Sequence, residues 1–293
     1  MLKNLCPSPV SPGRVVIVGA GGFVGAATED RLIASGIEVI AITRQDIDLL
    51  SDGASGQLAS ILRHTDTLVF IAAQAPVKSN AMLIDNLRMA AVVCIALDSI
   101  QAANVIYVSS DAVYADSSNL LNEASCAHPA SLHGVMHLTR EVMLAEACKA
   151  PLCILRPTLI YGANDPHNGY GPNRFRRLAQ RGEEIALFGA GEEQRDHVYI
   201  DDVAEIIVRC VVHKSQGILN IATGTVTSFA DVAKKAAALA PNTPVIKNTE
   251  RSGPMPHRGY RAFDSSATAR AFPDFCYTPL EIGLALSQKQ EFH

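Results

Sequence analysis

The sequence lacks a cluster of basic residues. No run of lysines and arginines appears along the 293 residues, and the formal net charge is −4 with a pI near 6.1. Proteins that bind nucleic acid usually present a concentrated basic surface. The composition therefore argues against a nucleic-acid partner, and we expect none.

The signals of membrane insertion, secretion and disulfide bonding are also missing. No apolar segment approaches the ~20 residues that a membrane helix needs, and residues 1–13 have no apolar stretch of the kind found in a signal peptide. The seven cysteines form no Cys-x-x-Cys pair, which is typical of reduced, buried thiols. We expect a flexible tail over residues 1–13 and a soluble, cytoplasmic protein that does not contact a membrane.

The most informative stretch that is present runs from Arg14 to Gly25. Residues 15–18 form an unbroken β-branched run, as expected of a strand buried on both faces. Three glycines follow as Gly19-x-x-Gly22-x-x-Gly25, and a helical pattern comes after them. Glycines at such a turn let the backbone approach a pyrophosphate, and the N-terminus of the helix favours phosphate. The stretch predicts a dinucleotide-binding turn rather than an ordinary tight turn.

Apolar runs alternate with helical patterns along the rest of the chain. We expect long helices over residues 79–102 and 132–148, and strands near residues 38–43, 47–49, 67–73, 105–108 and 152–156. This alternation predicts the α/β class, a Rossmann-like doubly wound parallel sheet with a small C-terminal substrate-binding lobe. We assign residues 14–165 to the dinucleotide-binding core. Residues 166–293 are expected to complete the sheet and to form the lobe.

The end of the second strand favours NADP over NAD. In such folds an acidic residue at this point binds the ribose 2′-hydroxyl of NAD, whereas an arginine accommodates the 2′-phosphate of NADP. The sequence has Arg44 here and no carboxylate before Asp46. We therefore predict NADP as the cofactor, with NAD as the alternative if Arg44 is only an exposed loop residue.

Short motifs lie in a fixed order along the chain. After the glycine turn they are Ala72-Ala73-Gln74, Asn86, Ser109-Ser110-Asp111-Ala112-Val113-Tyr114, Arg156-Pro157-Thr158-Leu159-Ile160-Tyr161-Gly162 and Gln194-Arg195-Asp196-His197-Val198-Tyr199-Ile200-Asp201-Asp202-Val203. Together they resemble the extended short-chain dehydrogenase/reductases, the NAD-dependent epimerase/dehydratase group that acts on nucleotide-linked sugars. The resemblance extends from Arg14 to about Leu286.

The resemblance implies a serine after the fifth strand and a Tyr-x-x-x-Lys pair on the next helix. Ser110 stands at the serine position and Asp111 follows it, but His133 and His137 occupy the tyrosine and lysine positions. We therefore take Ser110, Asp111, His133 and His137 as the candidate catalytic residues. The cofactor contacts implied by the resemblance are Gly19, Gly22, Phe23, Val24, Gly25, Arg44, Asp48, Leu49, Ala72, Ala73, Gln74, His137 and Pro157.

The histidine pair allows several interpretations. In the first, His133 replaces the tyrosine as acid/base, because residues four apart share a helix face and an imidazole titrates near ~6.5 without a neighbouring ammonium. In the second, the protein binds cofactor, nucleotide sugar or a partner without turnover. In the third, His133 and His137 hold a metal ion; no third ligand is evident and the family uses none, so we expect no metal. Chemistry without cofactor redox remains as a further alternative.

Positive charge and one asparagine suggest how a nucleotide sugar would bind. Arg195, together with Arg258 or Arg261, matches arginines that grip the diphosphate in the family, and a planar guanidinium suits phosphate oxygens. Surface ion pairs are the alternative for each arginine. Asn173 is expected either to bind the diphosphate or to cap the helix that begins there.

The predicted function is therefore NAD(P)-dependent modification of a nucleotide-linked sugar, of the epimerase or 4-keto reductase type, for surface polysaccharide or a glycosylated metabolite. In this hypothesis Ser110 holds the sugar oxygen, His133 moves the proton and His137 orients the ribose. The alternative is a non-catalytic NAD(P)- or nucleotide-sugar-binding protein of the same fold. The long apolar helix over residues 79–102 and the helix over 132–148 favour a homodimer, because an apolar helix of this length needs cover on more than one side.

Overall fold

The β-branched run after the N-terminal segment forms strand β2 (Arg14–Val18), in which every residue is buried. Val15 and Ile17 belong to one hydrophobic cluster, whereas Val16 and Val18 belong to another. Because successive side chains of a strand point to opposite faces, both faces of the sheet around β2 are covered. The computed structural model describes residues 1–290 of the chain.

The main sheet has seven strands in the order β1-β10-β6-β5-β4-β2-β3. All neighbours pair in parallel except β1, which runs antiparallel to β10. The strands that accompany β2 are β1 (Lys3–Asn4), β3 (Glu38–Ile42), β4 (Thr67–Phe70), β5 (Asn104–Val108), β6 (Leu152–Pro157) and β10 (Ser215–Ile221).

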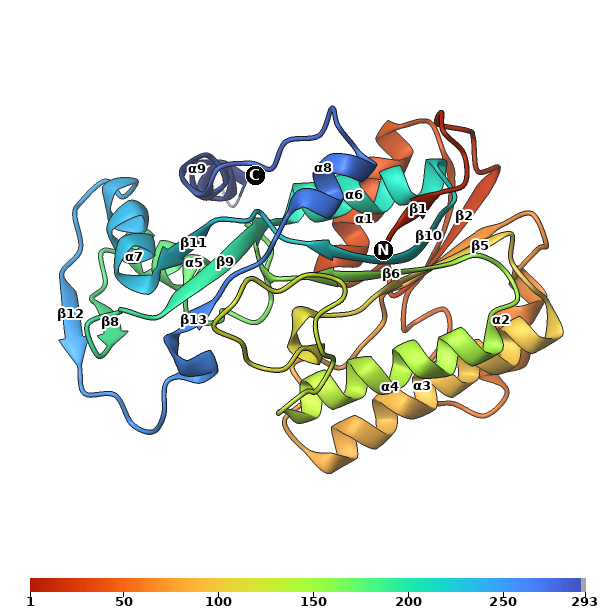
Figure 1. Ribbon diagram of the computed structural model, residues 1–293, viewed down its shortest axis with the longest axis horizontal. Coiled ribbons are helices and arrows are strands. Elements are labelled where there is room, and N and C mark those ends of the chain that lie inside the picture. The colour runs from red at the N-terminus through yellow and green to blue at the C-terminus, as the bar shows by residue number, and fades with distance from the viewer. Residues whose placement is uncertain (291–293) are drawn as a thin grey trace.

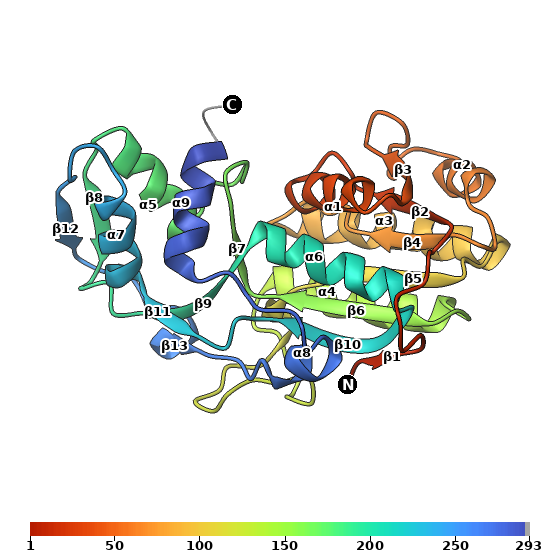
Figure 2. The same cartoon turned by 90° about the horizontal axis from the view of Figure 1, so that it is seen from above.

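Helices cover the two faces of this sheet, as Figures 1 and 2 show. One face is covered by α2 (Ala54–Ile61), α3 (Asn80–Ser99) and α4 (Leu132–Ala147), and the opposite face by α1 (Phe23–Ala34) and α6 (Ile200–Val212). The short helix α8 (Ser266–Ala271) packs beside β10 (Figure 2), and a 3₁₀ turn, η1 (Asp111–Val113), follows β5.

A smaller lobe lies at one end of the main sheet (Figure 2). Its larger sheet is built around β9 (Gln194–Tyr199), which pairs with β7 (Leu159–Tyr161), β11 (Val226–Ser228) and β13 (Tyr260–Arg261). A second sheet consists of β8 (Ile185–Phe188) and β12 (Ile246–Thr249). The remaining elements are α5 (Pro172–Gln180), α7 (Phe229–Ala238), η2 (Pro256–Gly259) and α9 (Leu280–Gln290). Phe175 and Phe229 belong to the separate hydrophobic core of this lobe.

This architecture confirms the predicted fold class. The expected helices and all but one of the expected strands are present. The strand predicted at residues 47–49 is wrong: these residues lie in an irregular segment between and within two turns, although Ile47 and Leu49 are buried. Asp46 accepts hydrogen bonds from the amide and hydroxyl of Thr43, and Asp48 accepts one from the amide of Leu50. Such local side-chain bonds stabilise turns in place of sheet ladders.

The segment predicted as a flexible tail is attached to the sheet instead. Lys3 and Asn4 pair with Gln216 and Ser215 along the edge of β10. Further along the segment, backbone amides of Cys6 and Val10 donate to the carbonyls of residues 213 and 212. A free sheet edge offers unpaired donors and acceptors, which explains why this polar segment docks there. The proposed boundary at residue 165 stays a prediction, since β10 belongs to the main sheet but follows strands of the lobe.

One helix in the described part of the chain, α3, is long and apolar enough to cross a membrane by length and composition. It is also a core helix of this fold. Ala90, Val93 and Leu97 are 0% exposed and pack in the cluster on one face of the main sheet.

Candidate functional site

A cavity of about 1050 Å³ lies at the carboxyl ends of the central strands. Its wall includes Val18 of β2, Val108 of β5 and Pro157 of β6, and on the lobe side Tyr170 and Asn173. Ligands of doubly wound sheets bind in this crevice outside the carboxyl ends of the strands. The cavity is therefore the natural place in which to look for the predicted site residues.

The glycine turn forms one end of the cavity. Gly19 has a φ of +103°, and a Cβ there would lie 2.5 Å from the amide nitrogen of Ala72. A Cβ on Gly25 would lie 2.1 Å from the carbonyl oxygen of Gly19. Both positions thus require glycine, the first for its conformation and the second for close packing of α1 on the turn. Gly19, Gly22, Phe23 and Val24 line the cavity, whereas Gly25 acts behind it.

The loops after β4 and β3 continue the wall. Ala72, Ala73 and Gln74 line the cavity. The buried side chain of Asn86 in α3 holds this loop, because its amide oxygen accepts from the Gln74 amide and its nitrogen donates to the Gln74 carbonyl, both at 3.0 Å. These bonds fix the β4 loop against the helix.

Arg44, Asp48 and Leu49 also line the cavity. The Arg44 side chain is 75% exposed, and its guanidinium lies 3.2 Å from the Asp48 carboxylate. An exposed pair of this kind is weak. The guanidinium therefore remains free to exchange Asp48 for a ligand phosphate.

The loop after β5 supplies three polar side chains with different surroundings. Ser109 donates a 2.6 Å hydrogen bond to Glu141, which is paired with Arg156 in the core. Ser110 lines the cavity, and its hydroxyl oxygen accepts from the amide of residue 112. Its proton is not used in that bond, so Ser110 presents a donor to the cavity. Asp111 also lines the cavity, but its carboxylate is bound by a buried arginine.

His133 and His137 lie on one face of α4 and both line the cavity. Their ring centroids are 4.7 Å apart in an edge-to-face arrangement. Burial lowers the pKa of the His133 imidazole below its usual value, against an opposing effect of Asp111. Burial also holds the pKa of His137 well below the usual value, with smaller contributions from His133 and Arg140. Both rings are therefore neutral near pH 7.

The four residues predicted to bind the diphosphate of the nucleotide sugar have different positions and partners in the structure. Arg195 lines the cavity with 11% of its side chain exposed, and its Nη1 lies 3.3 Å from Glu193. Asn173 also lines the cavity, yet its amide oxygen accepts from the Gly162 amide and it does not occupy the cap position of α5. The asparagine is thus used to hold the end of β7, because its side chain reaches back to the preceding loop.

The two arginines near the C-terminal lobe do not line the cavity. Arg261 is buried and donates to Asp111 at 2.8 Å, so the structure gives it an internal ion pair in place of the predicted diphosphate contact. Arg258 is exposed, in the left-handed turn that follows Met255. Neither side chain reaches the cavity wall in this conformation.

Five histidines of the described residues line the cavity: His133, His137, His167, His197 and His257. The last three have no role in the sequence-based prediction. The ring of His197 is 5% exposed and neither of its nitrogens has a hydrogen-bond partner within the described structure. Burial lowers the pKa of His197 to about 3. The only sequence signal for it was its position two residues after Arg195 on a strand, where side chains share a face.

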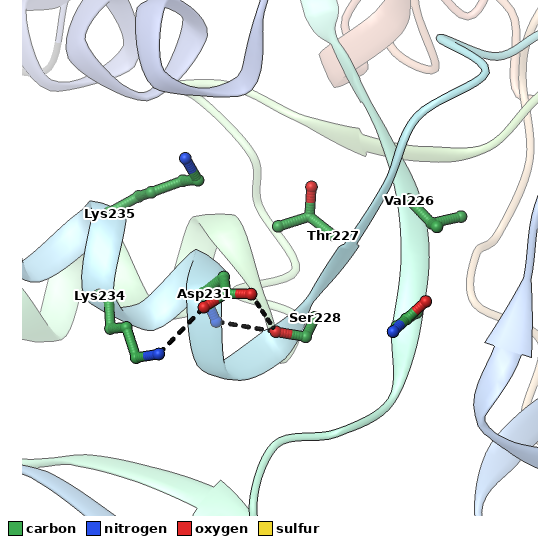
Figure 3. Close-up of a pocket in the computed structure, with 7 residues that line it drawn as sticks. Val226, Thr227, Ser228, Asp231, Lys234 and Lys235 are labelled. Atoms are coloured by element: carbon green, nitrogen blue, oxygen red, sulfur yellow. Dashed lines mark hydrogen bonds and ion pairs between the residues drawn. The ribbon is translucent and has the colours of Figure 1, made fainter.

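A second, more open pocket of about 400 Å³ lies in the lobe beside the start of α7. As Figure 3 shows, Ser228 and Asp231 face each other there and Lys234 points at the same carboxylate. Lys235 is paired with Glu281. Since both lysines already have acidic partners, this pocket presents no free cation from these two side chains.

The described residues supply no third ligand for a metal ion held by His133 and His137. Over residues 1–290, no three or more His, Cys, Asp or Glu side chains are grouped as a metal site would need. A tetrahedral site needs three or four such donors.

The model of the NAD dependent epimerase/dehydratase family matches residues 15–222. A curated dTDP-L-rhamnose 4-epimerase from Burkholderia thailandensis is 34% identical over 139 residues. That match covers 44% of this chain and 38% of the relative's length.

Solved structures share the fold over almost the whole chain. A UDP-glucose 4-epimerase from Thermotoga maritima, solved with UDP-glucose, has a TM-score of 0.80 at 23% identity and covers 95% of this chain and 98% of its own. A UDP-glucose 4-epimerase from Thermus thermophilus, in complex with NAD, has a TM-score of 0.80 at 19% identity, with coverages of 95% and 99%. At these identities the likeness concerns the fold.

Proposed function

The chain belongs to the NAD dependent epimerase/dehydratase family, and from this premise we propose that it is an enzyme that uses a nicotinamide cofactor to modify a nucleotide-linked sugar. The reaction we propose is an epimerisation or a 4-keto reduction, in the cytoplasm, for a surface polysaccharide or a glycosylated metabolite. Epimerases of UDP-sugars and of dTDP-L-rhamnose are among its relatives. The observation that carries the proposal is that His133 and Ser110 both line the cavity that the glycine turn closes.

The residues of this cavity fit a dinucleotide. A Cβ at Gly19 or Gly25 would collide with backbone atoms, which keeps the turn tight at the N-terminus of α1. Amides at a helix N-terminus favour phosphate. We propose that Gly22, Phe23 and the β4 loop hold the pyrophosphate side, and that Arg44 favours the 2′-phosphate of NADP. NAD, which the Thermus relative contains, is the alternative cofactor.

His133 takes the role of acid/base in this proposal. The bound cofactor would supply a hydride acceptor or donor at its nicotinamide ring. The neutral imidazole of His133 accepts the proton of the sugar hydroxyl as that carbon is oxidised, and returns it when the carbonyl is reduced. Ser110 donates a hydrogen bond to the same oxygen, and Arg195 binds the diphosphate. A base of this kind contributes about 10²–10⁴-fold to the rate.

The experiment is a turnover assay with NAD or NADP, in both redox states, and a panel of UDP-, dTDP- and GDP-sugars. We expect isomerised or reduced product, followed by chromatography and by absorbance near 340 nm, and at least about a 100-fold loss of kcat in His133→Ala. His128→Ala is the control, because His128 is exposed. Since the pKa of His133 is lowered, the acidic limb of the kcat/KM profile is expected below pH 6.5. Full activity in His133→Ala would overturn the role of this residue.

The second candidate is a protein of the same fold that binds its ligands without turnover. It is favoured by the replacement of both the family tyrosine and the family lysine, and by the lack of any tyrosine between Tyr114 and Tyr161. Tight binding of cofactor together with no product from any sugar nucleotide would support it.

We further propose a homodimer through α3 and α4. The two helices pack side by side (Figure 1), and Ile84, Ile95 and Val142 on them are 57%, 52% and 64% exposed. Sedimentation of the wild type and of Val142→Asp would test this; a wild-type monomer at micromolar concentration would contradict it.

A further inference from the structure

A buried chain of three side chains runs from the core to the cavity. Tyr107 on β5 and Arg140 on α4 are both 0% exposed, and His137, which lines the cavity, is 5% exposed. The hydroxyl of Tyr107 lies 2.8 Å from Nδ1 of His137. His137 therefore does not face the cavity as an isolated ring, because its inner nitrogen is occupied.

The guanidinium of Arg140 packs beside Tyr107 in the core. It lies 4.5 Å from the ring centroid of Phe70 and 5.7 Å from that of Tyr107, and its Nη2 donates to the carbonyl of Ala72 at 2.9 Å. Within the described structure the Tyr107 hydroxyl has one hydrogen-bond partner, Nδ1 of His137. If Nδ1 carried the proton, the buried phenol proton would have no acceptor, which is costly. The phenol proton is therefore directed at Nδ1 of His137, and the nearby Arg140 charge favours the same orientation because it repels that proton.

Among residues 1–290, no carboxylate is paired with the buried Arg140 cation. The groups that raise the pKa of Arg140 are Tyr107 and Cys94 within the described chain, whereas burial lowers it. A buried charge with no opposite partner is costly. The Arg140 charge also opposes protonation of His137, as does the adjacent His133. The remaining ionised group near Tyr107 is Glu141, which is paired with Arg156.

We infer that Arg140 and Tyr107 are positioning residues that hold His137 as the neutral tautomer with its proton on Nε2. In this form the ring presents an N–H donor to the cavity, suited to a hydroxyl oxygen of the cofactor ribose. This inference rests on the proposed function for the identity of the ligand, but not for the tautomer. It also explains how a donor is kept at this point without a lysine: Tyr107 bonds Nδ1 of the imidazole, and the positive charge of Arg140 lies beside the Tyr107 ring.

The deciding measurement is the ¹⁵N spectrum of histidine-labelled protein without ligand, with the His137 signals assigned from His137→Gln. We expect Nε2 protonated and Nδ1 unprotonated in the wild type near pH 7. Tyr107→Phe keeps the ring that packs on Phe70 and Arg140 but removes the hydroxyl, and we expect it to give a mixture of tautomers. Tyr114→Phe is the matched control, since it removes a buried hydroxyl bonded to Asn220 at 2.7 Å; it is expected to leave His137 unchanged.

A proton on Nδ1 in the wild type, or an unchanged tautomer in Tyr107→Phe, would overturn the inference. A second variant, Arg140→Met, is expected to raise the pKa of His137, because the Arg140 charge opposes its protonation; if this variant does not fold, Tyr107→Phe still decides. Binding of NAD and NADP is expected to weaken about threefold to tenfold in Tyr107→Phe, the range of one neutral hydrogen bond. Wild-type protein that binds neither cofactor would refute the proposed function, while the spectrum would still decide the tautomer.

Discussion

Nε of Arg261 lies 2.8 Å from Oδ2 of Asp111, and this buried pair ties β13 of the lobe to the loop after β5. Only 2% of the Arg261 side chain and 9% of the Asp111 side chain are exposed. The pair joins residues 150 positions apart. The buried pair indicates that Arg261 stabilises the contact between the lobe and the main sheet, whereas Arg258 in the same segment is exposed.

Loss of Arg261 should therefore destabilise the protein, whereas loss of Arg258 should not. Removing one partner of a buried ion pair leaves a buried charge unpaired, at a cost of about 3–5 kcal/mol. We expect Arg261→Met to lower the free energy of unfolding by that amount in urea titrations, and Arg258→Ala to change it by less than about 0.5 kcal/mol. Equal stability of the two variants would contradict the structural role of Arg261.

The glycine turn should tolerate a methyl group at one position and not at another. A Cβ on Gly25 would lie 2.1 Å from the Gly19 oxygen, whereas a Cβ on Gly21 would lie 3.5 Å from Cγ2 of Thr43, an ordinary contact. Overpacking of a tight site costs roughly 1–3 kcal/mol or more. We expect Gly25→Ala to lower the free energy of unfolding by at least about 2 kcal/mol and Gly21→Ala by less than about 1 kcal/mol. Thermal and urea unfolding would show whether the order holds.

Arg44 should control the choice between the two cofactors. Its side chain is exposed and only weakly paired, so Arg44→Asp should leave stability almost unchanged. The variant places a carboxylate where the 2′-phosphate of NADP would lie, and we expect the ratio of Kd for NADPH to Kd for NADH to rise at least about tenfold. Arg63→Asp, a change of the same type at another exposed residue, is the control. An unaltered ratio in Arg44→Asp would remove this residue from cofactor selection.

His197 should make the protein lose stability in mild acid. Its folded pKa of about 3 lies below the value of about 6.5 expected in the unfolded chain. Above pH 6.5 the ring is neutral in both states and contributes no pH dependence. As the pH falls from about 6.5 toward 3, only the unfolded chain takes up this proton, so the free energy of unfolding falls by up to ~1.4 kcal/mol per pH unit.

The change His197→Phe removes this titration. We expect the free energy of unfolding of the variant, relative to that of the wild type, to be about 2 kcal/mol higher at pH 5 than at pH 7. Urea unfolding at both pH values measures this difference. The exposed His128 provides the control in His128→Phe, which should show no such gain. A difference between variant and wild type that is the same at both pH values would show that His197 is not the group responsible.

The main features of the fold follow from local sequence signals. The β-branched run at residues 15–18, the glycines that follow it and the apolar helix over residues 80–99 each specify their own conformation through side-chain shape and backbone freedom. Residues 47–49 look like a strand by the same criterion but form none. There the carboxylates of Asp46 and Asp48 capture backbone amides, and this competition depends on a few atoms rather than on periodicity.

The sequence by itself determined the parallel sheet, the glycine turn and the presence of two histidines on one helix face, since each depends on residues that are close along the chain. Only the tertiary structure decided the partners of the polar groups: Tyr107 for His137, Asp111 for Arg261 and the edge of β10 for the N-terminal segment. These contacts join residues 30 to more than 200 positions apart. Burial removes water as a competing partner, and a buried polar group then bonds to whichever residue the packed chain brings within reach.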